Sequence, residues 1–96
     1  MLVLITYDVS TQSRSGQSRL RKIAKICQNY GQRVQNSVFE CVLDPSLYLI
    51  IKNKLLATID PTVDSLRFYH LGNNYQKKTE HYGAKPSFNI TEPLIL

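Results

Sequence analysis

The sequence has 96 residues, the length of one small domain, and a formal net charge of +5 at pH 7. No apolar run approaches the ~18 residues of a membrane span and no secretory signal is recognisable, so we expect a cytoplasmic protein with no membrane partner. Two cysteines, Cys27 and Cys41, are too few and too widely spaced for a disulfide framework or a zinc knuckle. Their apolar neighbours predict reduced, buried thiols.

The chain begins with an apolar, β-branched segment, "LVLITYDV", over residues 2–9. Leu2 and Leu4 fall on one alternating face, and Val3 and Ile5 fall on the other. Apolar side chains on both faces are typical of a central strand that is covered on both sides.

A loop and a helix are predicted next. Residues 10–18 are rich in Ser, Thr and Gln, which indicates a loop. From about Ser18 to Tyr30 the apolar residues recur at helical spacing while the basic residues fall elsewhere, which predicts an amphipathic helix. We expect Gly31 to end it.

Residues 33–43 have the composition of β-structure. They contain one turn-like dipeptide, Asn36-Ser37, without the glycine that a tight hairpin usually has. Both a hairpin of two strands and one bent strand that changes partners fit this pattern.

Proline-containing pairs delimit a second helix. It is predicted to begin at Asp44-Pro45 and to run to the break at Asp60-Pro61. A further strand is predicted over residues 65–71, and the apolar "PLIL" near the end of the chain is a candidate for one more strand.

Strand, helix, strand region, helix and strand is the pattern of an α+β domain with a ferredoxin-like βαββαβ fold, provided that residues 33–43 form two strands. We expect a single domain over residues 1–96 with a core of about 1–72, an extra C-terminal strand, and an extension, residues 73–96, that packs on a partner subunit. Both helices of such a fold cover one face of the sheet. The second apolar face of the first strand therefore predicts a homodimer in which two such faces meet.

Half of the basic residues are concentrated in one part of the chain. Six of the twelve Lys and Arg residues, and no Asp or Glu, lie between Val9 and Phe39. Such a segment suits a polyanion-binding surface, because Lys and Arg that neutralise phosphates release counterions. A solvated helix face has the same pattern, so both interpretations stay open, and neither distinguishes DNA from RNA.

Asp8 stands at the end of the first predicted strand. If this strand lies near a two-fold axis, the Asp8 carboxylates of two subunits can share a magnesium ion that keeps several waters. Such an ion lowers the pKa of a bound water and stabilises charge on a scissile phosphate. The alternative is structural, with Asp8 accepting hydrogen bonds from the amides of the following loop.

The two histidines carry weaker signals. Neither His70, in the last predicted strand, nor His81, in the following segment, has a second ligand at zinc-binding spacing. His70 would serve as a general base only if the fold brought it near Asp8.

Two blocks, "LVLITYDVS" and "YGQRVQNSVFECVLD", flank the basic helix. With them the chain resembles, over essentially its whole length, the second core family of CRISPR-associated proteins, the small partner of the CRISPR integrase in spacer acquisition. The segment "LGNNYQKKTEHYGAKPS" is similar in particular to bacterial members from type I-C systems. The resemblance implies a ferredoxin-like homodimer.

The same resemblance implies roles for individual residues. Asp8 of the two subunits would face each other across the dimer cleft and bind Mg²⁺, with Mn²⁺ as an alternative metal. Tyr7 would line this catalytic site, Ser37 would position a water or the metal, and Phe39 would pack or stack beside the cleft. The positions that match phosphate-binding residues are Arg19, Arg21 and Arg33, with Arg14 able to replace one of them.

Members of this family are described as metal-dependent endonucleases acting on single-stranded RNA or double-stranded DNA. The resemblance therefore implies a magnesium-dependent endonuclease, a hydrolase of phosphodiester bonds, that acts with the CRISPR integrase in spacer acquisition. The alternative is a non-catalytic DNA-binding bridge between integrase dimers, for which the basic surface is needed and Asp8 is not.

Overall fold

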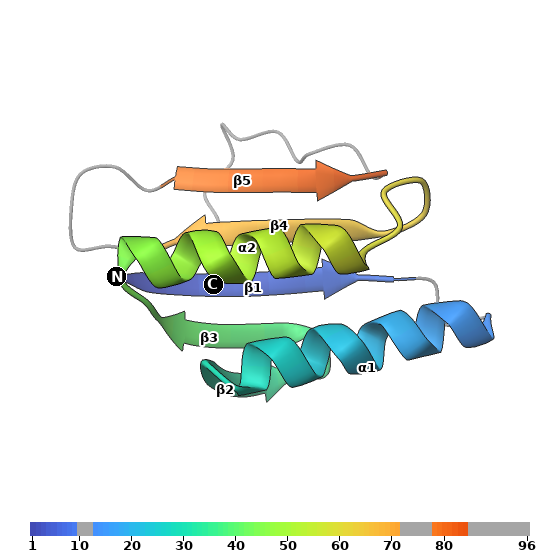
Figure 1. The fold of residues 1–96 in the computed structure, drawn as a ribbon, viewed down its shortest axis with the longest axis horizontal. Coiled ribbons are helices and arrows are strands. Elements are labelled where there is room, and N and C mark those ends of the chain that lie inside the picture. The colour runs from blue at the N-terminus through green and yellow to red at the C-terminus, as the bar shows by residue number, and fades with distance from the viewer. Residues whose placement is uncertain (10–12, 72–77, 85–96) are drawn as a thin grey trace.

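A computed structural model of the chain describes residues 1–9, 13–71 and 78–84. In chain order the elements are β1 (Leu2–Asp8), α1 (Arg14–Gln28), β2 (Gly31–Gln35), β3 (Val38–Val42), α2 (Pro45–Thr58), β4 (Ser65–His70) and β5 (Lys78–Gly83). The five strands form one sheet in the order β2-β3-β1-β4-β5, with every neighbouring pair antiparallel (Figure 1). The predicted ferredoxin-like α+β fold is confirmed, and the sheet has a fifth strand, β5, that was not predicted at this position.

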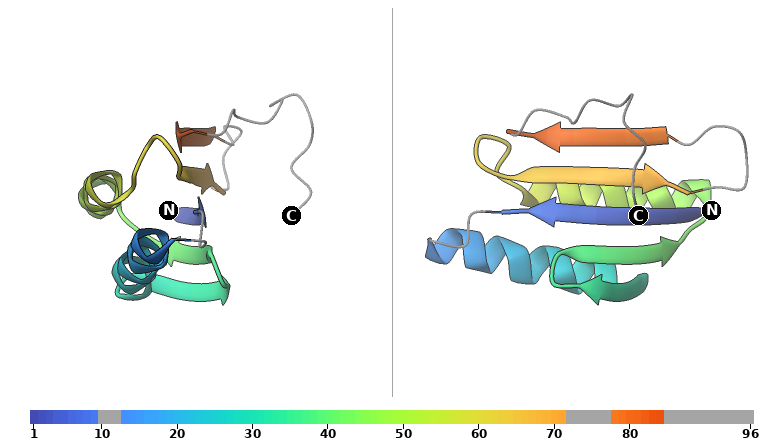
Figure 2. Two further views of the ribbon diagram at one scale, coloured as in Figure 1. Left: turned by 90° about the vertical axis from the view of Figure 1, so that its right-hand side faces the viewer. Right: turned by 180° about the vertical axis from the view of Figure 1, so that it is seen from behind.

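Both helices lie on one face of the sheet, as the end-on view in Figure 2 shows. Along β1, Val3, Ile5 and Tyr7 are buried beneath this helical layer, whereas Leu4 is half-buried and Asp8 is exposed. The described part of the chain therefore covers β1 on one face only. We call the other side the open face; the β1 and β3 residues on it are Leu2, Leu4, Thr6, Asp8, Val38, Glu40 and Val42.

Helix α1 begins four residues earlier than predicted, at Arg14 instead of Ser18. The side chain of Ser13 caps it by accepting a hydrogen bond from the Gly16 N–H at 3.0 Å. A glycine in the first turn lowers helix propensity, which is why the segment resembles a loop in the sequence. Gly16 is buried in the structure.

Gly31 does not end α1, because the helix stops at Gln28 and Gly31 is the first residue of β2. Among the described residues, Gly83 is the only one with a positive φ, so Gly31 is not a left-handed cap. What requires glycine at position 31 is close packing, since a Cβ there would lie 2.4 Å from the Cys41 Sγ.

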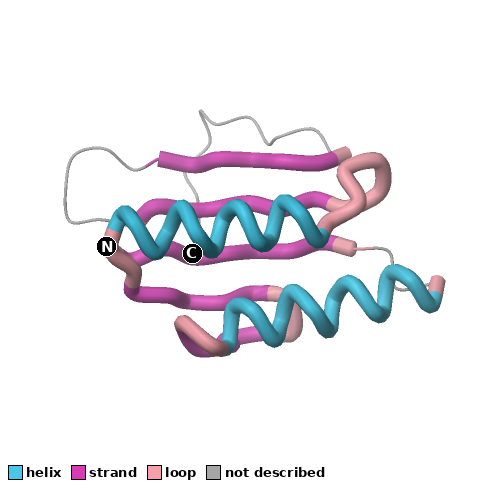
Figure 3. The backbone as a smooth tube through the Cα atoms, in the orientation of Figure 1, coloured by secondary structure: helices cyan, strands magenta, loops and turns pink. Residues whose placement is uncertain are grey.

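The hairpin interpretation of residues 33–43 is correct. β2 and β3 pair around the Asn36-Ser37 turn, and the register shifts between Arg33 and Gln35. This irregularity is a β-bulge, which accommodates one extra residue and re-aims the strand without a glycine. Figure 3 shows the short connection between the two strands.

The core lies between the sheet and the helices, and it contains both cysteines. Cys27 of α1 and Cys41 of β3 are buried and free, as predicted. Burial is the main cause that raises the pKa of Cys27 to about 12, so this thiol is inert at neutral pH. Neither α1 nor α2, the helices of the described ranges, is long and apolar enough to cross a membrane.

β5 pairs with β4 of the same chain and forms an edge of the sheet. The intrachain sheet therefore extends beyond the predicted core of about 1–72. The strand was hidden by its polar composition, "KTEHYG". "PLIL" lies outside the described residues, and packing of the C-terminal extension on a partner subunit stays a prediction.

A polar cluster around Glu80 fixes β5 against α2. One Glu80 oxygen accepts from Lys52 Nζ at 2.7 Å and from the Tyr82 hydroxyl at 3.0 Å. The other accepts from the Tyr48 hydroxyl and lies 3.0 Å from His70 Nε2. Burial alone would raise the pKa of Glu80, but these hydrogen bonds, led by that of Lys52, outweigh burial and lower the pKa to about 2.

This cluster predicts an acid-labile sheet edge. Because the folded-state pKa of Glu80 lies near 2 and its ordinary value is 4.5, the charged carboxylate stabilises the fold above about pH 4.5. That stabilisation, of about 1–3 kcal/mol, is lost as the pH falls toward 2. In urea unfolding followed by circular dichroism, Glu80→Gln should give a flatter dependence of unfolding free energy on pH than wild type. Glu40→Gln, at an exposed site, is the control, and parallel wild-type and Glu80→Gln profiles would contradict the assignment.

Candidate functional site

Asp8 is exposed on the open face, at the last position of β1. It lies directly opposite Ser65 of β4 in the strand register. The turn before β3 reaches the same end of the sheet, because the Tyr7 N–H donates to the Ser37 carbonyl at 2.9 Å. The structure therefore brings two of the predicted site residues, Asp8 and Ser37, close together.

Tyr7 points away from Asp8. Consecutive residues of a strand face opposite sides of the sheet, and the Tyr7 ring is buried beneath the helices. Its hydroxyl donates to Asp64 Oδ2 at 2.6 Å. The predicted position of Tyr7, lining the metal site, is thus corrected: it supports the strand end from the opposite face.

Arg19 is also directed to Asp64. Its Nε donates to Asp64 Oδ2 at 2.7 Å and its Nη2 donates to Oδ1 at 3.1 Å, which is a bidentate ion pair. The Arg19 side chain is only 16% exposed and Asp64 is fully buried. Burial would raise the pKa of Asp64, but the hydrogen bonds from Arg19, the Asp60 N–H and Tyr7 more than offset it, so the net shift is downward. The Arg19 guanidinium is thus directed to Asp64 in the structure, and its predicted phosphate contact stays a prediction.

Phe39 lies in the core. Its side chain is fully buried and pairs in register with Ile5, so of the two predicted roles the structure supports packing over stacking on nucleic acid. The Arg33 guanidinium carbon lies 5.5 Å from the centre of the Phe39 ring, within the range of a cation–π contact.

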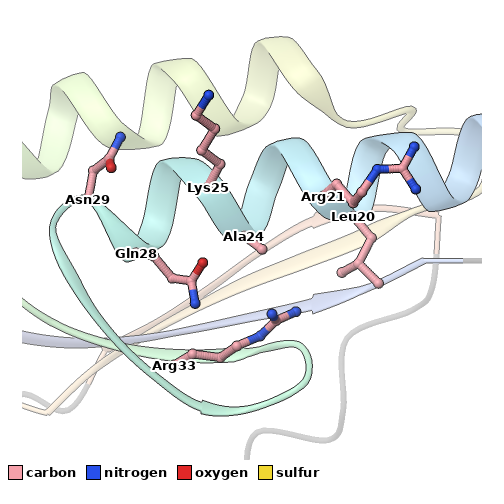
Figure 4. A pocket seen from close by; sticks show the side chains of 7 residues that line it. All are labelled: Leu20, Arg21, Ala24, Lys25, Gln28, Asn29 and Arg33. Atoms are coloured by element: carbon pink, nitrogen blue, oxygen red, sulfur yellow. The ribbon is translucent and has the colours of Figure 1, made fainter.

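Two of the predicted phosphate-binding residues, Arg21 and Arg33, line a groove between α1 and β2 (Figure 4). Its volume is about 350 Å³, and its lining residues are Leu20, Arg21, Ala24, Lys25, Gln28, Asn29 and Arg33. Three cationic side chains and no acidic side chain line it, so it suits an anionic ligand. Arg14, at the start of α1, is exposed as well.

The groove and Asp8 occupy different sides of the molecule. Helix α1 belongs to the helical layer and β2 is an edge strand, whereas Asp8 is on the open face. The structure thus joins Arg21 and Arg33 in one surface, which we call the basic groove, and leaves Asp8 outside it.

Three open-face residues near Asp8 were not predicted from the sequence. Ser65, opposite Asp8, has its Oγ 2.8 Å from Nε2 of His81, and Arg67 is the partner of His81 in the strand register. Burial, followed by the charge of Arg67, lowers the pKa of His81. His70 is paired with Val3 at the other end of β1, so it is not the histidine on the Asp8 side.

A metal at Asp8 would have few ligands from one chain. Within residues 1–9, 13–71 and 78–84 there is no group of three or more His, Cys, Asp or Glu side chains that could hold a metal ion. The Asp8 carboxylate is the donor type that Mg²⁺ prefers, and Mg²⁺ is commonly held by one or two carboxylates with waters completing its shell. A magnesium ion at Asp8 would therefore need further oxygen ligands from a second subunit or from the substrate.

A family model described as "CRISPR associated protein Cas2" matches residues 1–79. The chain belongs to the Cas2 family. This confirms the resemblance found in the two sequence blocks. The match to the Cas2 family spans β1 to β4 and includes Asp8, Ser37 and the residues of the basic groove.

Individual Cas2 relatives cover almost the whole chain. It is 62% identical over 95 residues to "CRISPR-associated endonuclease Cas2" of Halalkalibacterium halodurans, covering 99% of each sequence. It is 58% identical to "CRISPR-associated endoribonuclease Cas2" of Nitratidesulfovibrio vulgaris, covering 100% of this chain and 94% of that one. The crystal structure of Streptococcus pyogenes Cas2 at pH 6.5 is 55% identical with a TM-score of 0.74, over 78% of this chain and 90% of that chain.

Proposed function

We propose that this chain is a metal-dependent endonuclease that hydrolyses phosphodiester bonds of double-stranded DNA, single-stranded RNA or both, together with the CRISPR integrase in spacer acquisition. The observation that carries the proposal is the exposed Asp8 carboxylate at the end of the central strand. It is supported by the names of two relatives, one an endonuclease and the other an endoribonuclease.

A homodimer completes the proposed site. The open face carries apolar side chains from β1 and β3, and Val42 is 75% exposed. Exposed apolar groups of this kind are typical of interaction surfaces. When two open faces meet across a two-fold axis, this apolar surface is buried and the Asp8 carboxylates of the two subunits approach each other.

The chemistry that Mg²⁺ or Mn²⁺ supplies at this site is a lowered pKa of bound water and stabilisation of charge on the phosphate. The protein's part is to hold the two Asp8 carboxylates at fixed positions. Ser37, whose carbonyl accepts from the Tyr7 N–H at the same strand end, is the residue that we propose to orient a water. Arg14, Arg21 and Arg33 bind backbone phosphates, which makes affinity depend on salt.

A second function, a DNA-binding bridge between integrase dimers, is favoured by one observation. The basic groove lies away from the open face and contains no Asp8. Binding of nucleic acid is therefore separable from metal chemistry, and a dimer that carries two basic grooves is suited to hold a duplex even without cleavage.

The Asp8→Asn variant distinguishes these functions. Asparagine keeps the size of the side chain and removes the charge, so folding and nucleic-acid binding should persist while cleavage falls about 100-fold or more, as when a charge-stabilising group is removed. The measurement is cleavage of double-stranded DNA and single-stranded RNA with Mg²⁺, with Mn²⁺ and with a chelator.

The matched control for Asp8→Asn is Glu40→Gln, which removes a carboxylate elsewhere on the open face and should cleave like wild type. Equal cleavage by wild type and Asp8→Asn, or none by either, would contradict the nuclease and leave the bridge.

The dimer is tested by placing a charge on the open face. In sedimentation at micromolar concentration wild type should be a dimer, and Val42→Asp should be a monomer because it puts a carboxylate in the apolar interface. Leu49→Asp is the control, since Leu49 is 55% exposed but lies on α2, away from that interface, and should leave the dimer intact. A monomeric wild type would refute the shared metal site.

A further inference from the structure

We propose that Asp64, Arg19 and Tyr7 form a buried clamp that positions Asp8, and that Arg19 acts through Asp64 instead of binding phosphate. This inference rests on the proposed function of Asp8. It assigns a role to Asp64, which no sequence pattern indicated, and it changes the role of Arg19 from binding to positioning.

The Asp64 carboxylate is held in a closely defined environment. It is fully buried, and its two oxygens receive four donated hydrogen bonds. Three come from the side chains of Tyr7 and Arg19, and the fourth comes from the Asp60 N–H at 2.9 Å. A buried charge is tolerated only when it is paired and hydrogen-bonded in this way, so the geometry of the cluster is tightly constrained.

The clamp joins segments that are distant in the sequence. Tyr7 belongs to β1, Arg19 to α1, and Asp64 to the connection between α2 and β4. β5 is tied in as well, because the Ala84 N–H donates to the Asp64 carbonyl at 2.8 Å. Gly83 makes this approach possible with a φ of 116°, since a Cβ there would lie 2.0 Å from that carbonyl oxygen.

The strand register connects the clamp to Asp8. Tyr7 immediately precedes Asp8, Asp64 immediately precedes Ser65, and Asp8 and Ser65 are opposite each other in the register. The clamp therefore fixes the two strand ends that carry this pair. A slip of one residue would turn Asp8 toward the helices, because side chains alternate between the faces of a strand. Because Tyr7 is held on the helical face of the sheet, Asp8 faces the open face.

Arg19 and Arg21 have different surroundings although they lie on the same helix. Residues two apart on a helix do not face the same way, and the two arginines show this. Arg19 is 16% exposed with its guanidinium fork on Asp64. Arg21 is exposed and lines the basic groove, where no acidic side chain competes for it. A phosphate that took Arg19 would leave the buried Asp64 without its cation.

Two matched variants, Arg19→Gln and Arg21→Gln, test this separation, since each removes one positive charge from the same helix. Binding to a labelled DNA duplex is measured in chelator at several salt concentrations. Arg21→Gln should flatten the plot of log affinity against log salt, by about 0.9 for each phosphate that the variant no longer neutralises. Arg19→Gln should keep the wild-type slope.

Cleavage rates measured over a range of DNA concentrations should show the opposite pattern, with the larger effect on kcat in Arg19→Gln. We expect Arg19→Gln to lower kcat at least tenfold with little change in KM, and Arg21→Gln to raise KM with kcat nearly unchanged. Arg19→Lys should recover part of kcat, because it restores the charge but not the bidentate fork. Tyr7→Phe removes one hydroxyl and no charge and should lower kcat as Arg19→Gln does, so it carries the test if Arg19→Gln fails to fold.

A third readout does not depend on cleavage. Hydrogen exchange of the residues 7–9 backbone should be faster in Arg19→Gln and Tyr7→Phe, and unchanged in Arg21→Gln. If wild type fails to cleave, the proposed nuclease is refuted, and this exchange pattern still decides whether the clamp holds the Asp8 strand end. One result would refute the proposed clamp. In that result Arg19→Gln flattens the salt dependence of affinity as Arg21→Gln does, while its kcat and the hydrogen exchange at residues 7–9 stay at wild-type values.

Discussion

The pairing of the buried Asp64 carboxylate with Arg19 and Tyr7 is the interaction on which the rest of the site depends. A charge without access to water is stable only with a close counter-charge and full hydrogen bonding. Arg19 provides the counter-charge, and Arg19, Tyr7 and the Asp60 N–H provide the hydrogen bonds. These partners come from a helix and a strand that are distant in the sequence. The requirement to satisfy one buried charge therefore determines how α1 and the ends of β1 and β4 are placed relative to one another.

Side chains alternate between the two faces of β1, so the buried cluster around Asp64 also determines which way Asp8 faces. The same strand end presents Tyr7 to the helical layer and Asp8 to the open face, so the residue that is held and the residue that is exposed are neighbours in the chain. The basic groove is built on the opposite layer, from α1 and β2. The proposed metal site and the basic groove thus lie on separate surfaces, so the proposed nuclease and the proposed bridge use different parts of one small domain.

The sequence predicted what short-range patterns determine. The apolar, β-branched segment at residues 2–9 identified β1, and the Asp44-Pro45 cap identified the start of α2. The early start of α1 was missed because a glycine in the first turn lowers helix propensity, and the cap overrides this preference. Strand β5 was missed because its composition is polar, and its pairing with β4 overrides the low strand propensity. The clamp could not be predicted, since Arg19 and Asp64 are 45 residues apart and no local pattern links them.

The central claim is that Asp8, held by this clamp, is a metal ligand shared by two subunits. The most direct test is a titration of Mn²⁺ into wild type and Asp8→Asn with duplex DNA present, following the free ion by electron paramagnetic resonance. We predict one tightly bound ion for every two wild-type chains and loss of that ion in Asp8→Asn. Equal binding by the two proteins would contradict the claim.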